Sequence, residues 1–272
     1  MDRTQRPIGV FDSGMGGLSI LGALRAELPH EDFVYVADSG YAPYGERDDR
    51  HVIARSRVIT DYLRTQHGIK ALVMACNTAT AAAIHLLRQE QPDLPIIGVE
   101  PALKPAVNQS KTRRIGVMAT RSLLASAKFR DLMASQAAHT SFAVQPCDGL
   151  ANAIEHSAES GDTTKTIALC ARYTGAMGLF GTEKGEIDTL VLGCTHYPFA
   201  SEHLAKLVGP AVRLIDNGEP VARQTRRMLP SISSNLGQGQ SRLFTTGNAA
   251  ALRHAAQHWL GLRVSVESLL KG

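Results

Sequence analysis

Two cysteines occupy matching positions in the sequence, each at the end of a short apolar run. The run LVMAC ends at Cys76, the run LVLGC ends at Cys194, and a small polar residue follows each. A thiol between a strand and the helix after it feels the positive end of the helix dipole, which raises its thiolate fraction at neutral pH. A thiolate is a base, and the thiol that it becomes is an acid, so the pair suggests proton transfer.

Two exchangeable acid/base groups suit the inversion of a stereocentre that bears an acidic C–H. One group removes the proton from one face of the carbon, and the other returns a proton to the opposite face of the planar intermediate. Asn77, Thr78 and Thr195 adjoin the thiols and supply donors for a carboxylate on which charge develops. Taken alone, a cysteine at the end of a strand is usually an inert, small buried hydrophobe, and it is the pair in equivalent positions that favours the chemical interpretation.

The other two cysteines and the neighbouring histidine have plainer settings. Cys147 lies in a loop-like stretch and Cys170 in a helical pattern, so we expect both to pack in the interior. His196 lies two residues after Cys194, where it either relays the proton of the thiol or simply packs. A metal site needs further ligands at a recognised spacing, and none is found, so no metal is expected. No lysine stands in a setting that indicates a pyridoxal cofactor.

The glycine loop after the first apolar run has three interpretations. Gly14 and Gly16, with Asp38 further on, approach the dinucleotide fingerprint, but Ser19 occupies the third glycine position. The second interpretation is a tight strand-to-helix turn that needs glycine for its backbone. The third adds a small anionic or zwitterionic ligand, with its carboxylate at the start of the helix and Asp12 facing its ammonium or a catalytic group.

Alternating strands and helices must position these side chains. Apolar runs without polar alternation, separated by helical patterns, indicate a parallel sheet covered on both faces. In such sheets ligands bind at the carboxyl ends of the strands, where both cysteines and the glycine loop lie. The runs lie at residues 8–11, 33–36, 71–75 and 96–99, and the helical patterns at 18–28, 51–66 and 79–88.

The order of elements then begins again. Residues 115–118 repeat the character of residues 8–11, and the run that ends at Cys194 repeats the one that ends at Cys76. We therefore predict an α/β fold of two pseudo-symmetric parallel-sheet domains, with the active site in the cleft between them. The strand at 212–215 is assigned to a tail that returns to the first domain. The predicted domains are 1–98 with 212–272, and 99–211.

Length and composition exclude several classes of protein. With 272 residues, 44% hydrophobic and 20% charged, the chain has an ordinary globular composition, and its 5% aromatic content argues against a platform for stacked bases. The net charge is only +4, and the basic run at 111–114 indicates a solvated loop, so no nucleic-acid partner is expected. No apolar stretch approaches the roughly 20 residues of a membrane span, so no membrane is expected either. Four cysteines in so long a chain indicate free thiols in a reducing cytoplasm.

Four motifs occur in order along the chain, FDSGMGGL at 11–18, AD to PYGER at 37–47, ACNTA at 75–79 and LGCTHYP at 192–198. Together they resemble the glutamate racemase family. The resemblance covers nearly the whole chain. It implies a racemase without a cofactor that interconverts L- and D-glutamate and supplies D-glutamate for bacterial peptidoglycan. It also implies the two-domain fold, with Cys76 and Cys194 as the two acid/base residues.

The resemblance also implies roles for residues around the thiols. The auxiliary acid/base helpers map to Asp12, His196 and Glu155. The chain has Ser122-Leu123 where the family commonly has Gly-Thr, which removes one hydroxyl near the expected carboxylate site. The residues implied to contact the substrate are Asp12, Ser13, Pro43, Tyr44, Gly45, Asn77, Thr78, Thr120, Thr195 and His196.

Three other functions stay open at this point. The same thiol pair could racemise aspartate or another amino acid. Cys194 could instead be the nucleophile of a thiol hydrolase, with His196 nearby. A periplasmic-type amino-acid binding module also has two α/β halves, but we would expect an export signal, and residues 1–7 lack its apolar segment. The expected partner is the small-molecule substrate, glutamate, and the sequence leaves the oligomeric state open, with a homodimer as one option.

Overall fold

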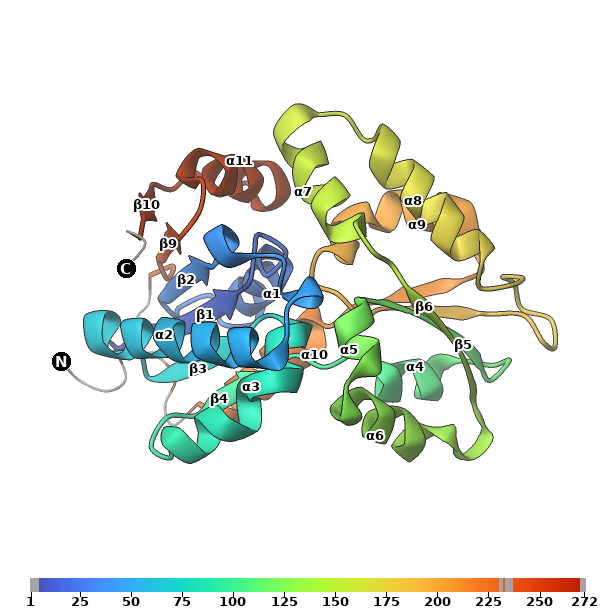
Figure 1. The fold of residues 1–272 in the computed structure, drawn as a ribbon, viewed down its shortest axis with the longest axis horizontal. Coiled ribbons are helices and arrows are strands. Elements are labelled where there is room, and N and C mark those ends of the chain that lie inside the picture. The colour runs from blue at the N-terminus through green and yellow to red at the C-terminus, as the bar shows by residue number, and fades with distance from the viewer. Residues whose placement is uncertain (1–4, 230–231, 233–236, 270–272) are drawn as a thin grey trace. The chain divides into compact units, whose positions relative to one another are not determined.

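The computed structural model describes residues 5–229, 232 and 237–269 of the chain. The chain folds into two compact units (Figure 1). The first unit is Met1–Val99 with Gly218–Gly272, and the second is Glu100–Asn217. Each unit contains its own parallel sheet, so the predicted fold class of two parallel-sheet α/β domains is confirmed.

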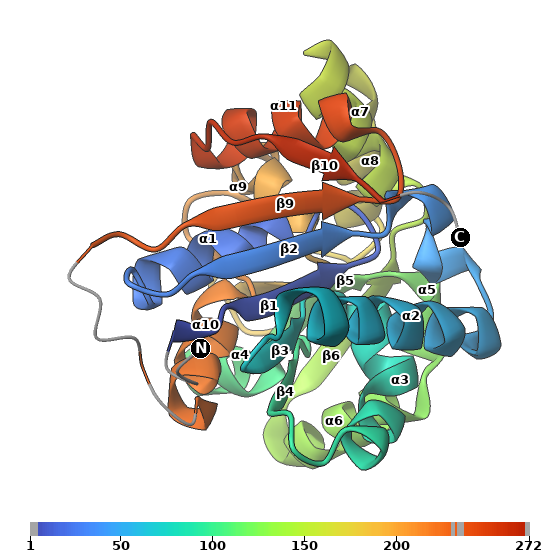
Figure 2. The ribbon, with the colours of Figure 1, turned by 90° about the vertical axis from the view of Figure 1, so that its left-hand side faces the viewer.

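The first unit contains a six-stranded parallel sheet in the order β10-β9-β2-β1-β3-β4. Every residue of the three central strands is buried, which is why they form continuous apolar runs. Strand β9 lies beside β2 although some two hundred residues separate them in sequence (Figure 2). The strands are β1 (Ile8–Asp12), β2 (Phe33–Ala37), β3 (Ala71–Met74), β4 (Ile96–Gly98), β9 (Ser241–Thr245) and β10 (Val266–Ser268).

In the part of the chain that the structure describes, five helices belong to this unit, and two of them have clear caps at both ends. Asp48 begins α2 by accepting a 2.8 Å hydrogen bond from the His51 N–H, and Gly68 ends it in the left-handed conformation. Asn248 caps α11 in the same way, and Gly261 ends it. The helices are α1 (Leu18–Glu27), α2 (Asp49–His67), α3 (Asn77–Glu90), α10 (Gly218–Met228) and α11 (Ala249–Leu260), with short 3₁₀ turns at Ser39–Tyr41 and Tyr44–Glu46.

The second unit contains a four-stranded parallel sheet in the order β6-β5-β7-β8. Its strands are β5 (Arg114–Ala119), β6 (Ser141–Pro146), β7 (Thr189–Leu192) and β8 (Arg213–Ile215). Its helices are α4 (Leu103–Gln109), α5 (Arg121–Ala125), α6 (Ala127–Gln136), α7 (Leu150–Ser160), α8 (Thr164–Gly175) and α9 (Ser201–Val208), with 3₁₀ turns at Ala137–His139 and Tyr197–Ala200.

The two sheets repeat one arrangement. The order β2-β1-β3-β4 in the first unit corresponds to β6-β5-β7-β8 in the second. The pairings agree in register as well, because Ile8 lies opposite Ala71 and Ile115 opposite Thr189. Strands β3 and β7, which lead to the two cysteines, are therefore equivalent elements of their units.

Two details differ from the sequence prediction. The strand at 212–215 does not return to the first unit, because β8 pairs with β7 through Val191 and Ile215. The second unit therefore ends at Asn217 rather than at residue 211. The stretch before Cys147 is strand β6 rather than a loop.

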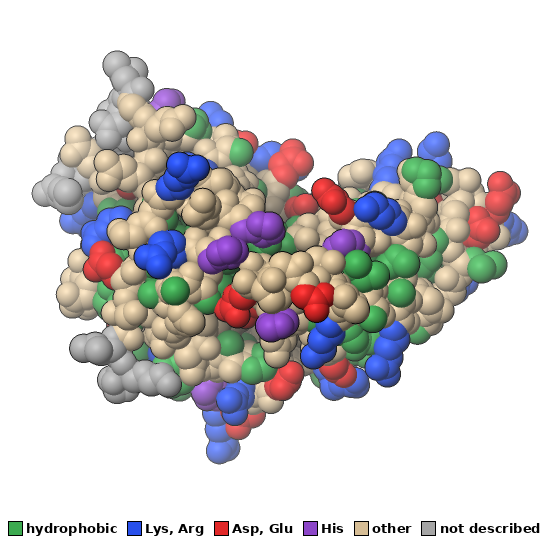
Figure 3. Space-filling view, turned by 90° about the horizontal axis from the view of Figure 1, so that it is seen from above, with side chains coloured by type: hydrophobic (Ala, Val, Ile, Leu, Met, Phe, Trp, Pro, Cys, Tyr) green, Lys and Arg blue, Asp and Glu red, His purple; other side chains and the backbone are tan. Residues whose placement is uncertain are grey.

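The surface carries charges of both signs. On the face in Figure 3, Lys and Arg side chains (blue) are mixed with Asp and Glu side chains (red). No helix in the part of the chain that the structure describes is long and apolar enough to cross a membrane.

Candidate active site

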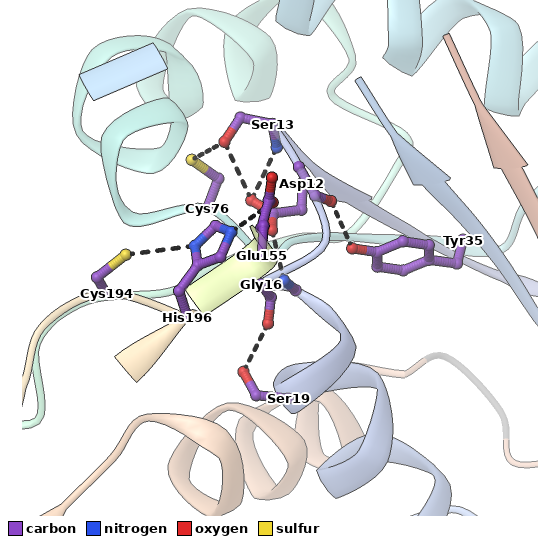
Figure 4. Close-up of polar contacts among 11 residues, drawn as sticks. Asp12, Ser13, Gly16, Ser19, Tyr35, Cys76, Glu155, Cys194 and His196 are labelled. Carbon is purple, nitrogen blue, oxygen red and sulfur yellow. Dashed lines mark hydrogen bonds and ion pairs between the residues drawn. The ribbon is translucent and has the colours of Figure 1, made fainter. Parts of the chain in front are cut away.

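In the first unit, three predicted residues meet at the carboxyl ends of β1 and β3 (Figure 4). Asp12 is the last residue of β1, and Cys76 is the residue just before α3. The Ser13 hydroxyl oxygen lies 3.5 Å from Cys76 Sγ and 3.4 Å from Asp12 Oδ1. Cys76 Sγ also accepts a hydrogen bond of 3.4 Å from the Ala79 N–H in the first turn of α3. We call Asp12, Ser13 and Cys76 the first half-site.

The glycine loop holds the carboxylate of Asp12. Asp12 is fully buried, and it accepts hydrogen bonds from the N–H of Ser13 at 2.7 Å and from the N–H of Gly17. A Cβ on Gly17 would lie 2.6 Å from Asp12 Cβ and 3.0 Å from the Tyr35 hydroxyl, so the close approach requires glycine. The carboxylate occupies the start of α1, where a pyrophosphate would bind, which argues against the dinucleotide interpretation.

Asn77, next to Cys76, has a buried side chain without a partner among the residues that the structure describes. The residue is 5% exposed, and neither its Oδ1 nor its Nδ2 has a hydrogen-bond partner among them. Leaving such groups unsatisfied costs about 1–3 kcal/mol each. Thr78 is also buried beside it, in the same first turn of α3. The amide of Asn77 is therefore suited to bind a polar group of a ligand at this end of the sheet.

The hydroxyl of Tyr44 is already engaged within the first unit. Tyr44 is buried, and its hydroxyl donates to Asp38 Oδ2 at 2.6 Å. Burial raises the pKa of Tyr44, and the charge of Asp38 raises it further, so the hydroxyl stays protonated. Tyr44 and its neighbours Pro43 and Gly45 would thus meet a ligand through their backbone.

Asp38 also connects two further segments of the first unit, and the sequence did not reveal these contacts. Its carboxylate accepts two hydrogen bonds of 2.9 Å from the Arg55 guanidinium and one of 2.9 Å from the Thr246 hydroxyl. Arg55 lies on α2, and Thr246 directly follows β9. The spacing of Asp38 from the glycine loop alone suggests a ribose ligand, whereas in the structure Asp38 anchors the segment that carries Tyr44.

In the second unit, Cys194, His196 and Glu155 form a contact series (Figure 4). His196 Nδ1 lies 3.6 Å from Cys194 Sγ, and His196 Nε2 lies 2.7 Å from Glu155 Oε1. Cys194 and His196 follow β7, whereas Glu155 is on α7. Both Cys194 and His196 are buried. We call these three residues the second half-site.

The environment of His196 favours its protonated form. Burial alone would lower the pKa of His196, but the hydrogen bonds to Cys194 and Glu155 and the charge of Glu155 outweigh burial and hold that pKa well above its usual range. A protonated imidazole is a hydrogen-bond donor at both of its ring nitrogens. The second half-site can therefore hold and exchange a proton near Cys194.

Other predicted residues of the second unit lie at the same edge of its sheet. Thr120 follows β5 and caps α5 by accepting a 3.3 Å hydrogen bond from the Leu123 N–H. Leu123, which replaces the expected hydroxyl, is buried. Thr195, which lies between Cys194 and His196 in the sequence, is also buried.

The two remaining cysteines have the environment of packed thiols. Cys147 and Cys170 are buried. Burial raises the pKa of Cys147 and raises that of Cys170 to about 11, so both are neutral at physiological pH. Among the described residues, no three His, Cys, Asp or Glu side chains form a group that could hold a metal ion.

Comparisons with known proteins agree with this chemistry. The model of a family described as Asp/Glu/Hydantoin racemase matches residues 19–225. A glutamate racemase of Ectopseudomonas mendocina is 45% identical over 254 residues, which are 93% of this chain and 90% of that protein.

Solved structures show the same likeness. The crystal structure of a glutamate racemase isoform from Bacillus anthracis has a TM-score of 0.86 at 32% identity and covers 98% of this chain and 100% of that one. Escherichia coli glutamate racemase, in complex with L-glutamate and an activator, has a TM-score of 0.83 at 28% identity and covers 97% and 98%.

Proposed function

The chain belongs to the Asp/Glu/hydantoin racemase family, and from this premise we propose that it interconverts L- and D-glutamate with Cys76 and Cys194 as the two bases. The observation that carries the proposal is the equivalence of the two half-sites. Each has its thiol just past the same strand of a repeated sheet, and each surrounds that thiol with donors.

In the proposed reaction the two thiols act on opposite faces of one α-carbon. One cysteine, as the thiolate, removes the α-proton, and the other, as the thiol, donates its proton to the opposite face. The two cysteines have then exchanged protonation states, and the same steps in reverse convert the other enantiomer. Negative charge develops on the α-carboxylate during the transfer, and preorganised donors stabilise it. The orphaned amide of Asn77 and the hydroxyls of Thr78 and Thr195 are suited to this role.

Each thiol has neighbouring side chains that can donate a proton to it or accept one from it. Ser13 and Asp12 lie beside Cys76, and His196 with Glu155 lies beside Cys194. All of these groups are side chains of the protein itself, and the proposed reaction uses no cofactor. Glutamate is the proposed substrate because relatives named glutamate racemase match over most of the chain, and D-glutamate is the product that peptidoglycan synthesis in the cytoplasm consumes.

Single substitutions of the cysteines test the proposal. Cys76→Ser and Cys194→Ser should each abolish the loss of optical rotation from either enantiomer, because a serine hydroxyl is a much weaker acid. Cys170→Ser is the matched control, since Cys170 is buried in α8, and it should keep the rate. Near-normal racemisation in either active-site variant would refute the two-base mechanism. In D₂O the product should carry deuterium at the α-carbon.

The same experiments separate the other candidate functions. The contact series Cys194–His196–Glu155 by itself would also suit a thiol hydrolase. A hydrolase would give a burst with activated esters and would not need Cys76. Aspartate in place of glutamate in the rotation assay tests a racemase of different substrate preference.

A further inference from the structure

The hydroxyl of Ser13 has two acceptors and one proton. Its oxygen lies 3.5 Å from Cys76 Sγ and 3.4 Å from Asp12 Oδ1 (Figure 4). A hydroxyl rotates about its C–O bond and can direct its proton to either neighbour. The direction of this bond therefore depends on which neighbour carries the more exposed negative charge.

Asp12 does not depend on that hydroxyl. Its Oδ1 already accepts the Ser13 N–H at 2.7 Å, and its Oδ2 accepts the Gly17 N–H. Both donors are backbone groups, one directly after β1 and one directly before α1, and they hold the carboxylate whichever way the hydroxyl turns. The proton of the Ser13 hydroxyl is thus available to the sulfur whenever Cys76 is a thiolate.

The sulfur of Cys76 then has two donors on two elements. The Ala79 N–H approaches at 3.4 Å from α3, and the Ser13 hydroxyl approaches from the end of β1. Asp12 and Tyr44 are titratable groups of this unit that interact with the site, and both are still present when Ser13 is substituted. Cys194 has a different neighbour, because the imidazole of His196 lies 3.6 Å from its sulfur.

We propose that the Ser13 hydroxyl is the hydrogen-bond donor that stabilises the Cys76 thiolate, a catalytic role distinct from its expected contact with substrate. When the thiolate takes the α-proton, the new S–H donates to the Ser13 oxygen and the hydroxyl turns back to Asp12. No proton leaves the serine, so the step balances. The kinetic consequence rests on the proposed racemase function, but the effect on the thiol does not.

Alkylation of the resting protein tests the proposal without any substrate. The protein reacts with iodoacetamide over a range of pH, and peptide mass spectrometry follows Cys76 and Cys194 in the same molecules. Ser13→Ala should slow alkylation of Cys76 about tenfold at pH 7 and move its half-maximal pH up by about one unit, the size expected for one charge-assisted hydrogen bond. Ser13→Thr keeps the hydroxyl and should restore most of the rate.

Two internal references make the outcome clear. Cys194 should keep its alkylation rate in every variant. Ser19→Ala removes another hydroxyl of the same segment, one that donates to the Gly16 carbonyl. This substitution should leave the alkylation rate of Cys76 unchanged. An unchanged rate at Cys76 in Ser13→Ala, or an equal loss at both cysteines, would overturn the proposal.

A kinetic readout connects the effect to catalysis. In D₂O, α-proton exchange in Ser13→Ala should slow most from the enantiomer that Cys76 deprotonates. Equal slowing from both enantiomers would contradict a role specific to Cys76. If the chain racemised nothing while Ser13 still controlled Cys76 alkylation, the proposed function would fail and this inference would stand.

Discussion

Glu155 and His196, 41 positions apart in sequence, join through a 2.7 Å contact between Oε1 and Nε2. This contact fixes the orientation of the imidazole ring. Because Nε2 contacts Glu155, it is Nδ1 that faces the sulfur of Cys194. A carboxylate on the far nitrogen orients the ring and favours its charged form. The pair therefore links the geometry of the second half-site to its protonation.

The first prediction concerns the pH dependence of stability in Glu155→Gln. The pKa of His196 in the folded protein is well above its unfolded value of about 6.5. The resulting stabilisation is fully present below about pH 6.5 and is lost as pH rises through the folded pKa. Glu155→Gln should therefore be less stable than the parent by about 1.5–3 kcal/mol at pH 6, and the gap should narrow as pH rises.

Urea unfolding at several pH values measures this gap. Glu159→Gln is the control, because Glu159 is exposed one turn further along α7. A constant gap across the pH range would show that Glu155 does not act through His196.

The second prediction compares two arginines of α2. Arg55 forms an ion pair with the fully buried Asp38, and its guanidinium lies 3.5 Å from the Tyr41 ring centre. Arg55→Met leaves the carboxylate buried without its cation and should cost about 3–5 kcal/mol of unfolding free energy. Arg57, two residues on, pairs with Glu90 at the surface, and Arg57→Met should leave the urea midpoint nearly unchanged. Equal midpoints for the two variants would rule out a special role for Asp38.

The third prediction concerns the close packing at Gly17. Gly17→Ala places a methyl group 2.6 Å from Asp12 Cβ and should displace the carboxylate from the start of α1. We expect a loss of about 1–3 kcal/mol and a fall in racemisation rate. Gly175→Ala, at the end of α8, meets open space and should be neutral or about 0.4–1 kcal/mol more stable. Thermal unfolding and the rotation assay check both variants, and full activity in Gly17→Ala would contradict the prediction.

The fourth prediction concerns the orphaned amide of Asn77. Asn77→Leu removes two buried polar atoms that have no partner, so the ligand-free protein should be as stable as the parent or more stable. The same change should abolish the rise in melting temperature that glutamate gives to the parent protein. Differential scanning calorimetry with and without glutamate measures both effects. A destabilised variant that still responded to glutamate would mean that Asn77 serves the fold rather than the ligand.

Much of the fold follows from the sequence because its central strands are buried on both faces. Strands β1, β2 and β3 form unbroken apolar runs, and the repeat of that pattern revealed the second unit. Strand β6 lacks such an unbroken apolar run, since its residues are half-buried or exposed. Strand β8 has only three residues, and so short an edge strand does not reveal which sheet it joins.

The site was predictable where a single segment carries the chemistry. Cys76 and Cys194 stand out because each follows an apolar strand and precedes a polar turn. The contact of Glu155 with His196 spans two distant elements and was not predicted, and only the family resemblance had singled out Glu155. The network at Asp38 depends on Arg55 and Thr246, whose approach comes from tertiary packing and leaves no local pattern in sequence.

The discontinuous first unit has a consequence for synthesis on the ribosome. Strand β2 needs β9 as its neighbour, yet residue 245 emerges 208 positions after residue 37. At about 5–20 residues per second, β2 waits about 10–40 s for that partner. The whole of the second unit, Glu100–Asn217, is translated during this interval and can fold first. The nascent chain thus exposes one unpaired strand edge at the stage when premature association with other chains is most damaging.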